Sequence, residues 1–131
     1  MVVGDWAPQV DILAHPSTGG FMSHCGWNSC LESITTGVPI LAWPIQGDQP
    51  RNAFFVVNIL MAGLAITAWE QIGQIVTSAT ICGVIKRLMA SREGAEIRRK
   101  VEEIGVAARQ AVQEGGVSRL EMDSFITHIT R

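Results

Sequence analysis

The chain has 131 residues, enough for one domain or for part of a larger one. Apolar residues make up 47% of it, and its formal net charge is only -2 at pH 7. This balance gives no electrostatic reason to expect a nucleic-acid partner or an anionic membrane partner. Seven of the ten basic residues lie in the range 86–109, but glutamates are interleaved with them, as on a solvated helix face.

The three cysteines are an odd number without a CxxC pair: Cys25, Cys30 and Cys82. This pattern does not fit a disulfide framework, and reduced thiols in a cytoplasmic protein fit it well. We expect no metal and no cofactor, because a zinc site needs three or four converging ligands and His15 and His24 do not make a helical pair. The first residues do not show the pattern of a basic segment followed by an apolar one that is typical of a secretory leader, and no apolar run is long enough to span a bilayer.

Short apolar runs alternate with segments of helical periodicity in the first half of the chain. Strands are expected at 2–3, 21–23, 39–43 and 64–66, separated by helices at 10–15, 27–36 and 52–61. The strands are apolar almost throughout, which indicates a parallel sheet covered by helices on both faces. We expect Gly37 to end the helix at 27–36, because glycine readily adopts the left-handed conformation at that position.

The second half of the chain is predicted to be helical. Helices are expected at 72–89 and 95–112 and from Ser118 onward, with Glu121 completing a capping box at the start of the last one. Met122, Phe125, Ile126 and Ile129 fall on one face of that last helix. The chain therefore divides into a sheet region, 1–70, and a helical region, 71–131.

Three polar segments come directly after expected strands, at 6–9, 24–32 and 48–49. Ligands of doubly wound sheets bind outside the carboxyl ends of the strands, so we expect the three segments to border one cleft. The helix start near Trp27 offers free N–H groups and the positive end of the helix dipole, which attract phosphate. An indole such as Trp6 can stack on a base, and a carboxylate such as Glu32 suits a ribose diol.

The spacing of these residues resembles the donor-binding box of plant UDP-dependent glycosyltransferases. The matching segments are Trp6-Ala7-Pro8-Gln9, His24-Cys25-Gly26-Trp27-Asn28-Ser29, Glu32-Ser33, Gly37-Val38-Pro39, Trp43-Pro44 and Asp48-Gln49. So many residue types at fixed spacing make a specific match, and the amino-acid sequence of residues 14–24 is most similar to that of zeatin O-glycosyltransferases. The resemblance implies the C-terminal half of a two-domain GT-B fold, with a Rossmann-like α/β sheet followed by C-terminal helices.

The resemblance also implies a role for each matching residue. Trp6 would stack on uracil, with Ala7 and Gln9 near the base and ribose and Glu32 on the ribose hydroxyls. The diphosphate would be held by His24, Asn28 and Ser29, and the sugar would be contacted by Trp27, Asp48 and Gln49. The glutamine at the end of the box indicates UDP-glucose or UDP-xylose as donor.

The family reaction is an inverting displacement of UDP by a hydroxyl of a small acceptor, here a cytokinin such as zeatin by the narrower resemblance. The family's catalytic histidine and aspartate lie in an N-terminal domain, so we expect no catalytic residue in this chain and a parent enzyme that supplies that domain. The alternative is a truncated, non-catalytic module that binds UDP-sugar or associates with a partner.

Other interpretations of single residues stay open. Trp6 could be a core residue, Asp48 an exposed turn residue and Cys25 either a reactive thiol or a small buried residue. A hydrolase using Ser29, His24 and Asp48 is not favoured, because the GxSxG nucleophile motif is absent.

Overall fold

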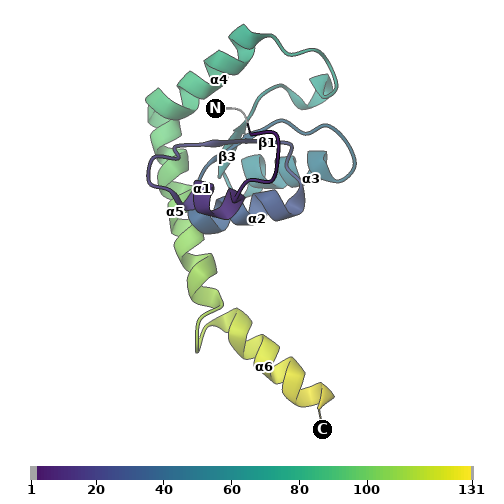
Figure 1. Cartoon of the computed structure of the whole chain (residues 1–131), viewed down its shortest axis with the longest axis vertical. Coiled ribbons are helices and arrows are strands. Elements are labelled where there is room, and N and C mark those ends of the chain that lie inside the picture. The colour runs from purple at the N-terminus through teal and green to yellow at the C-terminus, as the bar shows by residue number, and fades with distance from the viewer. Residues whose placement is uncertain (1–2, 131) are drawn as a thin grey trace.

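A computed structural model describes residues 3–130 of the chain. The elements, in chain order, are α1 (Gln9–Ala14), β1 (Phe21–Ser23), α2 (Trp27–Thr36), β2 (Ile40–Ala42), α3 (Gln49–Phe54), η1 (Phe55–Ile59), β3 (Gly63–Ala65), η2 (Trp69–Gln71), α4 (Ser78–Ala90), α5 (Arg92–Ala111) and α6 (Val117–Ile129). Strands alternate with helices up to β3, and helices follow, as the sequence predicts (Figure 1).

The described residues form one parallel sheet of three strands in the order β1-β2-β3. Phe21 pairs with Ile40, and Ile40 in turn pairs with Gly63, so the strands begin level with one another. The predicted first strand at 2–3 is not seen: Val3 is exposed and lies in no strand, and Val2 lies outside the described residues. The other three predicted strands are confirmed.

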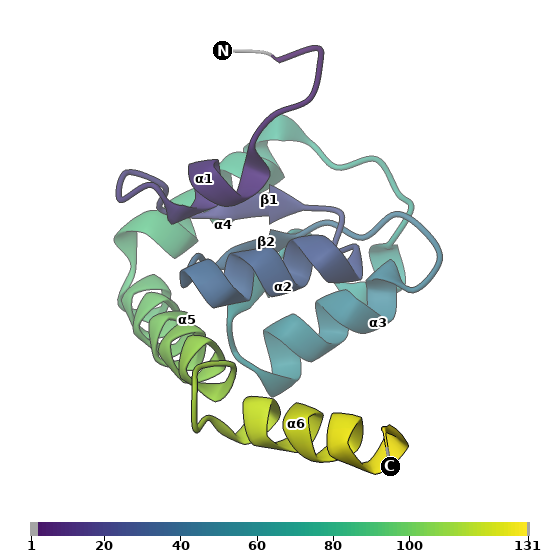
Figure 2. The same cartoon turned by 60° about the horizontal axis from the view of Figure 1, so that its bottom comes forward.

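Helices cover both faces of the sheet (Figure 2). On one face, α2, α3 and η1 pack on β2 through a cluster that includes Cys30, Ile34, Ile40, Ala53 and Val56. On the other face, Leu88 of α4 packs on Leu41, Leu64 and Ile66. Side chains of neighbouring strand residues point to opposite faces, so Ile40 and Leu41 enter different clusters. The predicted α/β architecture with two covered faces is confirmed.

Helix α5 joins the two faces by passing beside the amino ends of the strands. Its Ile97 belongs to the cluster under α4, whereas Val101, one turn further on, belongs to the cluster under α2. Glycines allow the close crossings: a Cβ at Gly94 would overlap the Leu88 carbonyl oxygen, and a Cβ at Gly105 would lie 2.7 Å from the Ile34 carbonyl oxygen. The far end of the strands, where the predicted binding residues lie, is left uncovered by α5.

Several predicted helix limits need correction. The helix predicted at 52–61 is α3 followed by the π-helical segment η1, and it begins three residues early. The helix predicted at 72–89 begins only at Ser78, where the Thr77 side chain accepts a hydrogen bond from the Thr80 amide. The predicted cap at Ser118 is wrong, because α6 begins at Val117 and no side chain caps it.

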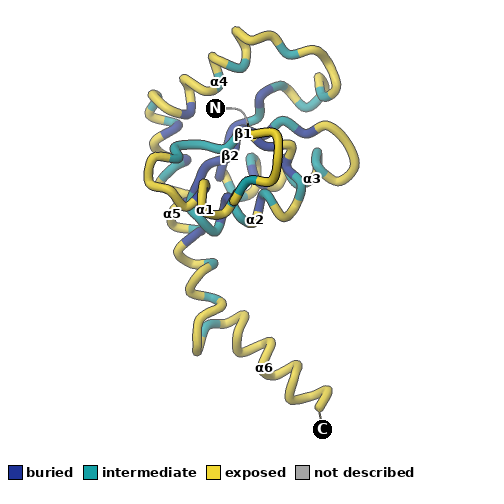
Figure 3. The backbone as a smooth tube through the Cα atoms, in the orientation of Figure 1, coloured by how far each residue is buried: buried dark blue, intermediate teal, exposed yellow. Residues whose placement is uncertain are grey.

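Helix α6 extends away from the rest of the molecule (Figure 1) and is exposed along its whole length (Figure 3). The apolar side chains predicted on one face are all more than two-fifths exposed: Met122, Phe125, Ile126 and Ile129. Within residues 3–130, no helix combines the length and the apolarity needed to cross a bilayer.

Candidate functional site: a polar cradle at the carboxyl ends of the strands

The centre of the site is the turn between β1 and α2. Cys25 has a φ of 66°, which turns the chain sharply at the end of β1. Its amide donates to the Ser23 hydroxyl at 3.0 Å, which fixes the turn from inside. Gly26 then precedes α2, and a Cβ there would lie 2.6 Å from the His24 imidazole. The glycine therefore lets the exposed His24 ring lie against the helix start.

The first turn of α2 carries Trp27, Asn28 and Ser29. No side chain caps this helix start, so its amides are left for solvent or a ligand. Asn28 and Trp27 are exposed, and Ser29 is half-buried. The Trp27 ring leans on Phe55 with a centroid separation of 6.2 Å. A helix start with open amides and short polar side chains is a suitable place for an anion.

The segment before α1 lies against α2 through one side chain, Gln9. Its Nε2 donates to the Glu32 carboxylate at 2.6 Å and to the Ser29 hydroxyl at 3.2 Å. Three of the predicted binding residues, from two separate segments, are therefore in direct contact. Gln9 also orients the carboxylate, because an amide that donates to an ionised group makes a strong hydrogen bond.

A shallow pocket of about 230 Å³ lies beside this contact, lined by Trp6, Ala7, Gln9, Glu32 and their neighbours. The Trp6 side chain is 84% exposed, so the alternative that it is a core residue is wrong. An exposed indole next to a carboxylate matches what a base and its ribose would need, but the open indole face has no partner ring in the described residues.

Helix α3, which follows the loop after β2, reaches the same turn through Asn52. Its Nδ2 donates to the Cys25 carbonyl oxygen and to the Asp48 carboxylate, each at 3.0 Å. Asp48 itself is exposed and lies just before α3. The side-chain oxygen of Gln49, Oε1, points back onto its own loop and accepts from the backbone amides of Ile45 and Gln46 at 2.9 and 3.0 Å.

Sequence reasoning missed Asn52 and Ser23. Asn52 lies four residues after Asp48, which places both on one face of α3, and this spacing was the available signal. Ser23 gave no comparable signal, because its role depends on the left-handed conformation at Cys25.

The thiols of Cys25 and Cys30 are both fully buried, and both belong to the core cluster under α2. The hydrogen bond with Cys30 and the burial together raise the pKa of the Cys25 thiol well above its usual range. A protonated, inaccessible thiol is a poor nucleophile, so the interpretation of Cys25 as a small buried residue is confirmed.

Across the described residues, no three His, Cys, Asp or Glu side chains are placed to hold a metal ion. The cradle (Trp6, Ala7, Gln9, His24, Trp27, Asn28, Ser29, Glu32, Asp48 and Gln49) thus offers an exposed ring, open helix amides and two carboxylates. This set suits a ligand with a flat base, hydroxyl groups and phosphates.

Comparison with known proteins gives this arrangement a context. The chain is 53% identical over all 131 residues to zeatin O-xylosyltransferase of Phaseolus vulgaris and 52% identical to zeatin O-glucosyltransferase of Phaseolus lunatus. It spans only 29% and 28% of the lengths of these two proteins. Among solved structures, Medicago truncatula UGT71G1 complexed with UDP-glucose is 41% identical, with a TM-score of 0.87 over 96% of this chain and 27% of that one.

The profile of one protein family, described as UDP-glucoronosyl and UDP-glucosyl transferase, matches residues 1–92, which include the whole cradle. The solved structures of this kind share the GT-B architecture, and the three-stranded parallel sheet with its helices superposes on part of it. The chain belongs to the UDP-glucoronosyl and UDP-glucosyl transferase family.

Proposed function

We propose that this chain is the UDP-sugar-binding part of an inverting UDP-glycosyltransferase. The parent enzyme transfers a glucosyl or xylosyl group to a hydroxyl of a small molecule, in our proposal a cytokinin such as zeatin. The observation that carries the proposal is the double hydrogen bond of Gln9 to Ser29 and Glu32. It joins the segment of Trp6 to the open start of α2, and so it supports our assignment of neighbouring residues to base, ribose and phosphate.

In this proposal the sheet region, 1–70, contributes the donor cradle and the helical region, 71–131, supports it. Trp6 stacks on the uracil, Gln9 and Glu32 bind the ribose, and the amides and side chains at 28–29 hold the diphosphate with His24. Asp48 and Gln49 contact the sugar hydroxyls. We assign no role to a metal, because the helix amides, with their partial positive charge, and the polar side chains can donate to a diphosphate.

The similarity to zeatin O-xylosyltransferase and zeatin O-glucosyltransferase supports the cytokinin acceptor and leaves two candidate donors, UDP-xylose and UDP-glucose. The acceptor and the catalytic base belong, in our proposal, to the part of the parent enzyme that corresponds to the remaining length of these relatives. Cys25, Cys30 and Cys82 form no disulfide within the described residues, and this supports our proposal of a cytoplasmic location for the parent enzyme.

Calorimetric titration tests the cradle directly. We expect UDP-glucose to bind, and we expect Glu32→Ala to weaken the binding of UDP by about ten- to hundred-fold, since a hydrogen bond to a charged group contributes about 1.5–3 kcal/mol. Pyrophosphate, which has no ribose, should bind equally to both forms. Glu121→Ala on the exposed helix α6 is the matched control. Equal losses for UDP and pyrophosphate would remove the ribose assignment.

The second candidate function is a module that binds UDP-sugar without catalysis. The observation that favours it is that His24, the histidine of the cradle, lies against the helix start at Gly26, where it suits a phosphate better than an acceptor hydroxyl. The chain incubated with UDP-glucose and zeatin should then form no glucoside although it binds the donor. Sustained glucoside formation by the chain alone would show that the base is within these 131 residues.

A further inference from the structure

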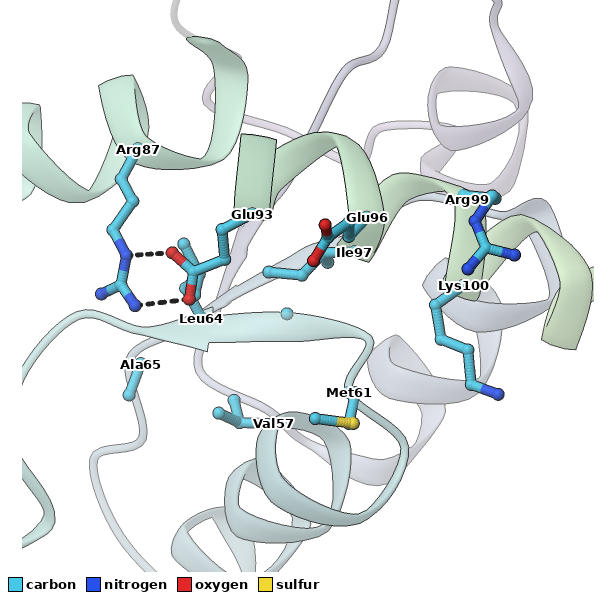
Figure 4. Close-up of a pocket in the computed structure, with 11 residues that line it drawn as sticks. Val57, Met61, Leu64, Ala65, Arg87, Glu93, Glu96, Ile97, Arg99 and Lys100 are labelled. Atoms are coloured by element: carbon cyan, nitrogen blue, oxygen red, sulfur yellow. Dashed lines mark hydrogen bonds and ion pairs between the residues drawn. The ribbon is translucent and has the colours of Figure 1, made fainter. Parts of the chain in front are cut away.

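A second hollow lies beside β3, between η1 and α5, and none of the cradle residues lines it (Figure 4). Its volume is about 570 Å³, which falls within the range of small-molecule sites. Val57, Leu64 and Ile97 give it an apolar floor, and charged side chains of α5 form its rim. The hollow adjoins the start of β3, whereas the cradle follows the carboxyl ends of β1 and β2.

The hollow exists because β3 is an edge strand of the described sheet, with the small residues Gly63 and Ala65 on either side of Leu64. The bonds from Ile40 N to Ala62 O and from Ile66 N to Ala42 O show which residues face β2. In a parallel ladder the alternate residues face away, so the backbone groups of Gly63 and Ala65 point off the sheet edge. No hydrogen bond from these two residues leaves the sheet in the described part of the chain. They are available to a ligand.

The wall on the side of η1 has an irregular backbone. The segment is π-helical, with the Leu60 amide bonded to the Phe55 carbonyl oxygen at 2.9 Å. Met61, which lines the hollow, follows with a φ of 53°, a conformation that few residues other than glycine adopt. Single π-helical turns and strained residues occur often at functional sites, so this wall points to a use for the hollow.

The charges on the rim leave one cation without a partner. Arg87 makes two bonds to the Glu93 carboxylate, as Figure 4 shows, and one of them measures 2.6 Å. The remaining charged rim residues except one are paired along α5, Arg92 with Glu96 and Arg99 with Glu103. Lys100 alone on this rim has no carboxylate within ion-pair distance among residues 3–130. The rim therefore favours an anion.

We propose that this hollow is a second ligand site of the chain, for a small amphipathic carboxylate. The apolar body of the ligand lies on Val57, Leu64 and Ile97, its carboxylate pairs with the Lys100 ammonium, and the outward backbone groups of β3 take its remaining polar atoms. Small-molecule pockets commonly combine an apolar lining with a few convergent polar groups in this way. The site is independent of the UDP-sugar cradle.

Amide NMR spectra of the isotope-labelled chain, titrated with naphthoate, test the proposal. We expect saturable shifts of the Gly63 and Ala65 amides. Lys100→Glu should weaken the binding of naphthoate by about five- to ten-fold, since it replaces an electrostatic attraction with a repulsion of similar size. Lys86→Glu on α4 changes the net charge equally, but Lys86 does not line the hollow. The affinity of this variant for naphthoate should stay within about two-fold of that of the unmodified chain. Naphthamide, which is neutral, should bind both lysine variants alike.

Three results would overturn the proposal. Shifts confined to residues 117–129 would show that naphthoate only coats the exposed apolar face of α6. Equal weakening by both lysine variants would show a general effect of net charge. Shifts of Gly63 and Ala65 that depend on protein concentration without naphthoate would show that a second copy of the chain occupies the edge of β3.

Discussion

At the scale of single residues, Asn52 shows how the cradle is held together. One amide group donates to the Cys25 carbonyl oxygen after β1 and to the Asp48 carboxylate after β2. Cys25 has the left-handed conformation in the turn after β1, and Asp48 is one of the residues proposed to contact the sugar. Asn52 touches neither base nor phosphate in our proposal, yet it sets the position of the sugar end relative to the phosphate end.

Replacing Asn52 with alanine should therefore affect the two ends of the donor unequally. We expect Asn52→Ala to weaken the binding of UDP-glucose more than the binding of UDP. We also expect it to lower the free energy of unfolding by about 1 kcal/mol, because the Cys25 carbonyl oxygen loses its partner. Calorimetric titration with both ligands and urea denaturation measure the two effects. Asn58→Ala, which removes a bond to the Phe54 carbonyl oxygen on the exposed side of η1, is the control. Equal weakening of both ligands would contradict the assigned role.

The ion pair of Arg87 with Glu93 makes a pH-dependent contribution to stability. The hydrogen bond from the Arg87 guanidinium lowers the pKa of the Glu93 carboxyl below its usual value of 4.5. Because the pKa is lower in the folded state than in the unfolded state, the ion pair stabilises the fold at pH values above the unfolded pKa. This contribution is lost as the pH falls through the folded pKa.

Comparison of the unmodified chain with its Glu93→Gln variant checks this effect. The variant should be less stable by no more than about 1 kcal/mol near neutral pH, because both side chains are about half exposed and solvent screens the pair. Urea denaturation should show this difference at low salt, and it should vanish once the pH is well below 4.5. A difference that persists in acid would mean that the glutamate side chain acts through packing instead.

At the scale of elements, the sequence predicts type and order well and limits less well. The strand at Phe21–Ser23 and the helix at Trp27–Thr36, ended by Gly37 with a φ of 77°, are found at their predicted limits. Their signals are local: an apolar run, a helical period and a glycine. The π-helical turn of η1 could not be predicted, because periodicity does not distinguish it from an α-helix. The contact of Gln9 with Glu32 joins residues 23 apart and depends on the fold.

The junction between α4 and α5 shows how one cap defines an element limit. The Ser91 hydroxyl accepts from the Gly94 amide at 3.0 Å and donates to the Arg87 carbonyl oxygen at 2.6 Å, so it serves the end of one helix and the start of the next. The sequence instead favours Ser118 as a cap, because a glutamate follows three positions later. That position carries no cap in the fold, since α6 already begins at Val117.

This difference predicts opposite results for two chemically equal substitutions. Ser91→Ala should lower the free energy of unfolding by about 1 kcal/mol, the usual cost of losing a serine cap. Ser118→Ala should change it by less than about 0.5 kcal/mol, because alanine favours a helix interior. Urea denaturation of the two variants and of the unmodified chain measures both changes in the free energy of unfolding. A larger loss at Ser118 would show that the capping box forms after all.

At the scale of the whole molecule, the chain is a body of two packed clusters with a helix attached to it. The clusters lie on the two faces of the sheet and share α5, whereas α6 contributes no buried residue. The relatives are more than three times longer than this chain, which spans 28–29% of them. The composition and strand pattern predict the body, but a sequence pattern cannot say what an amphipathic last helix packs against. The apolar face of α6 is present as predicted and is exposed.

The body should therefore keep its stability without the last helix. Deleting residues 117–131 should change the free energy of unfolding by less than about 0.5 kcal/mol, because no apolar surface of the two clusters is uncovered. The full chain should associate at high concentration through the apolar face of α6, and the shortened chain should do so less. Urea denaturation and light scattering measure the two effects.

Phe125→Ser in the full chain distinguishes the effect of the apolar face from the effect of the whole helix. Phe125 is 59% exposed, and this variant retains the rest of α6. It should reduce association as the deletion does and leave stability unchanged. If the deletion instead lowered the unfolding midpoint markedly while Phe125→Ser did not, α6 would be supporting the body through its contact with α5, and the division of the molecule into a body and an attached helix would be wrong.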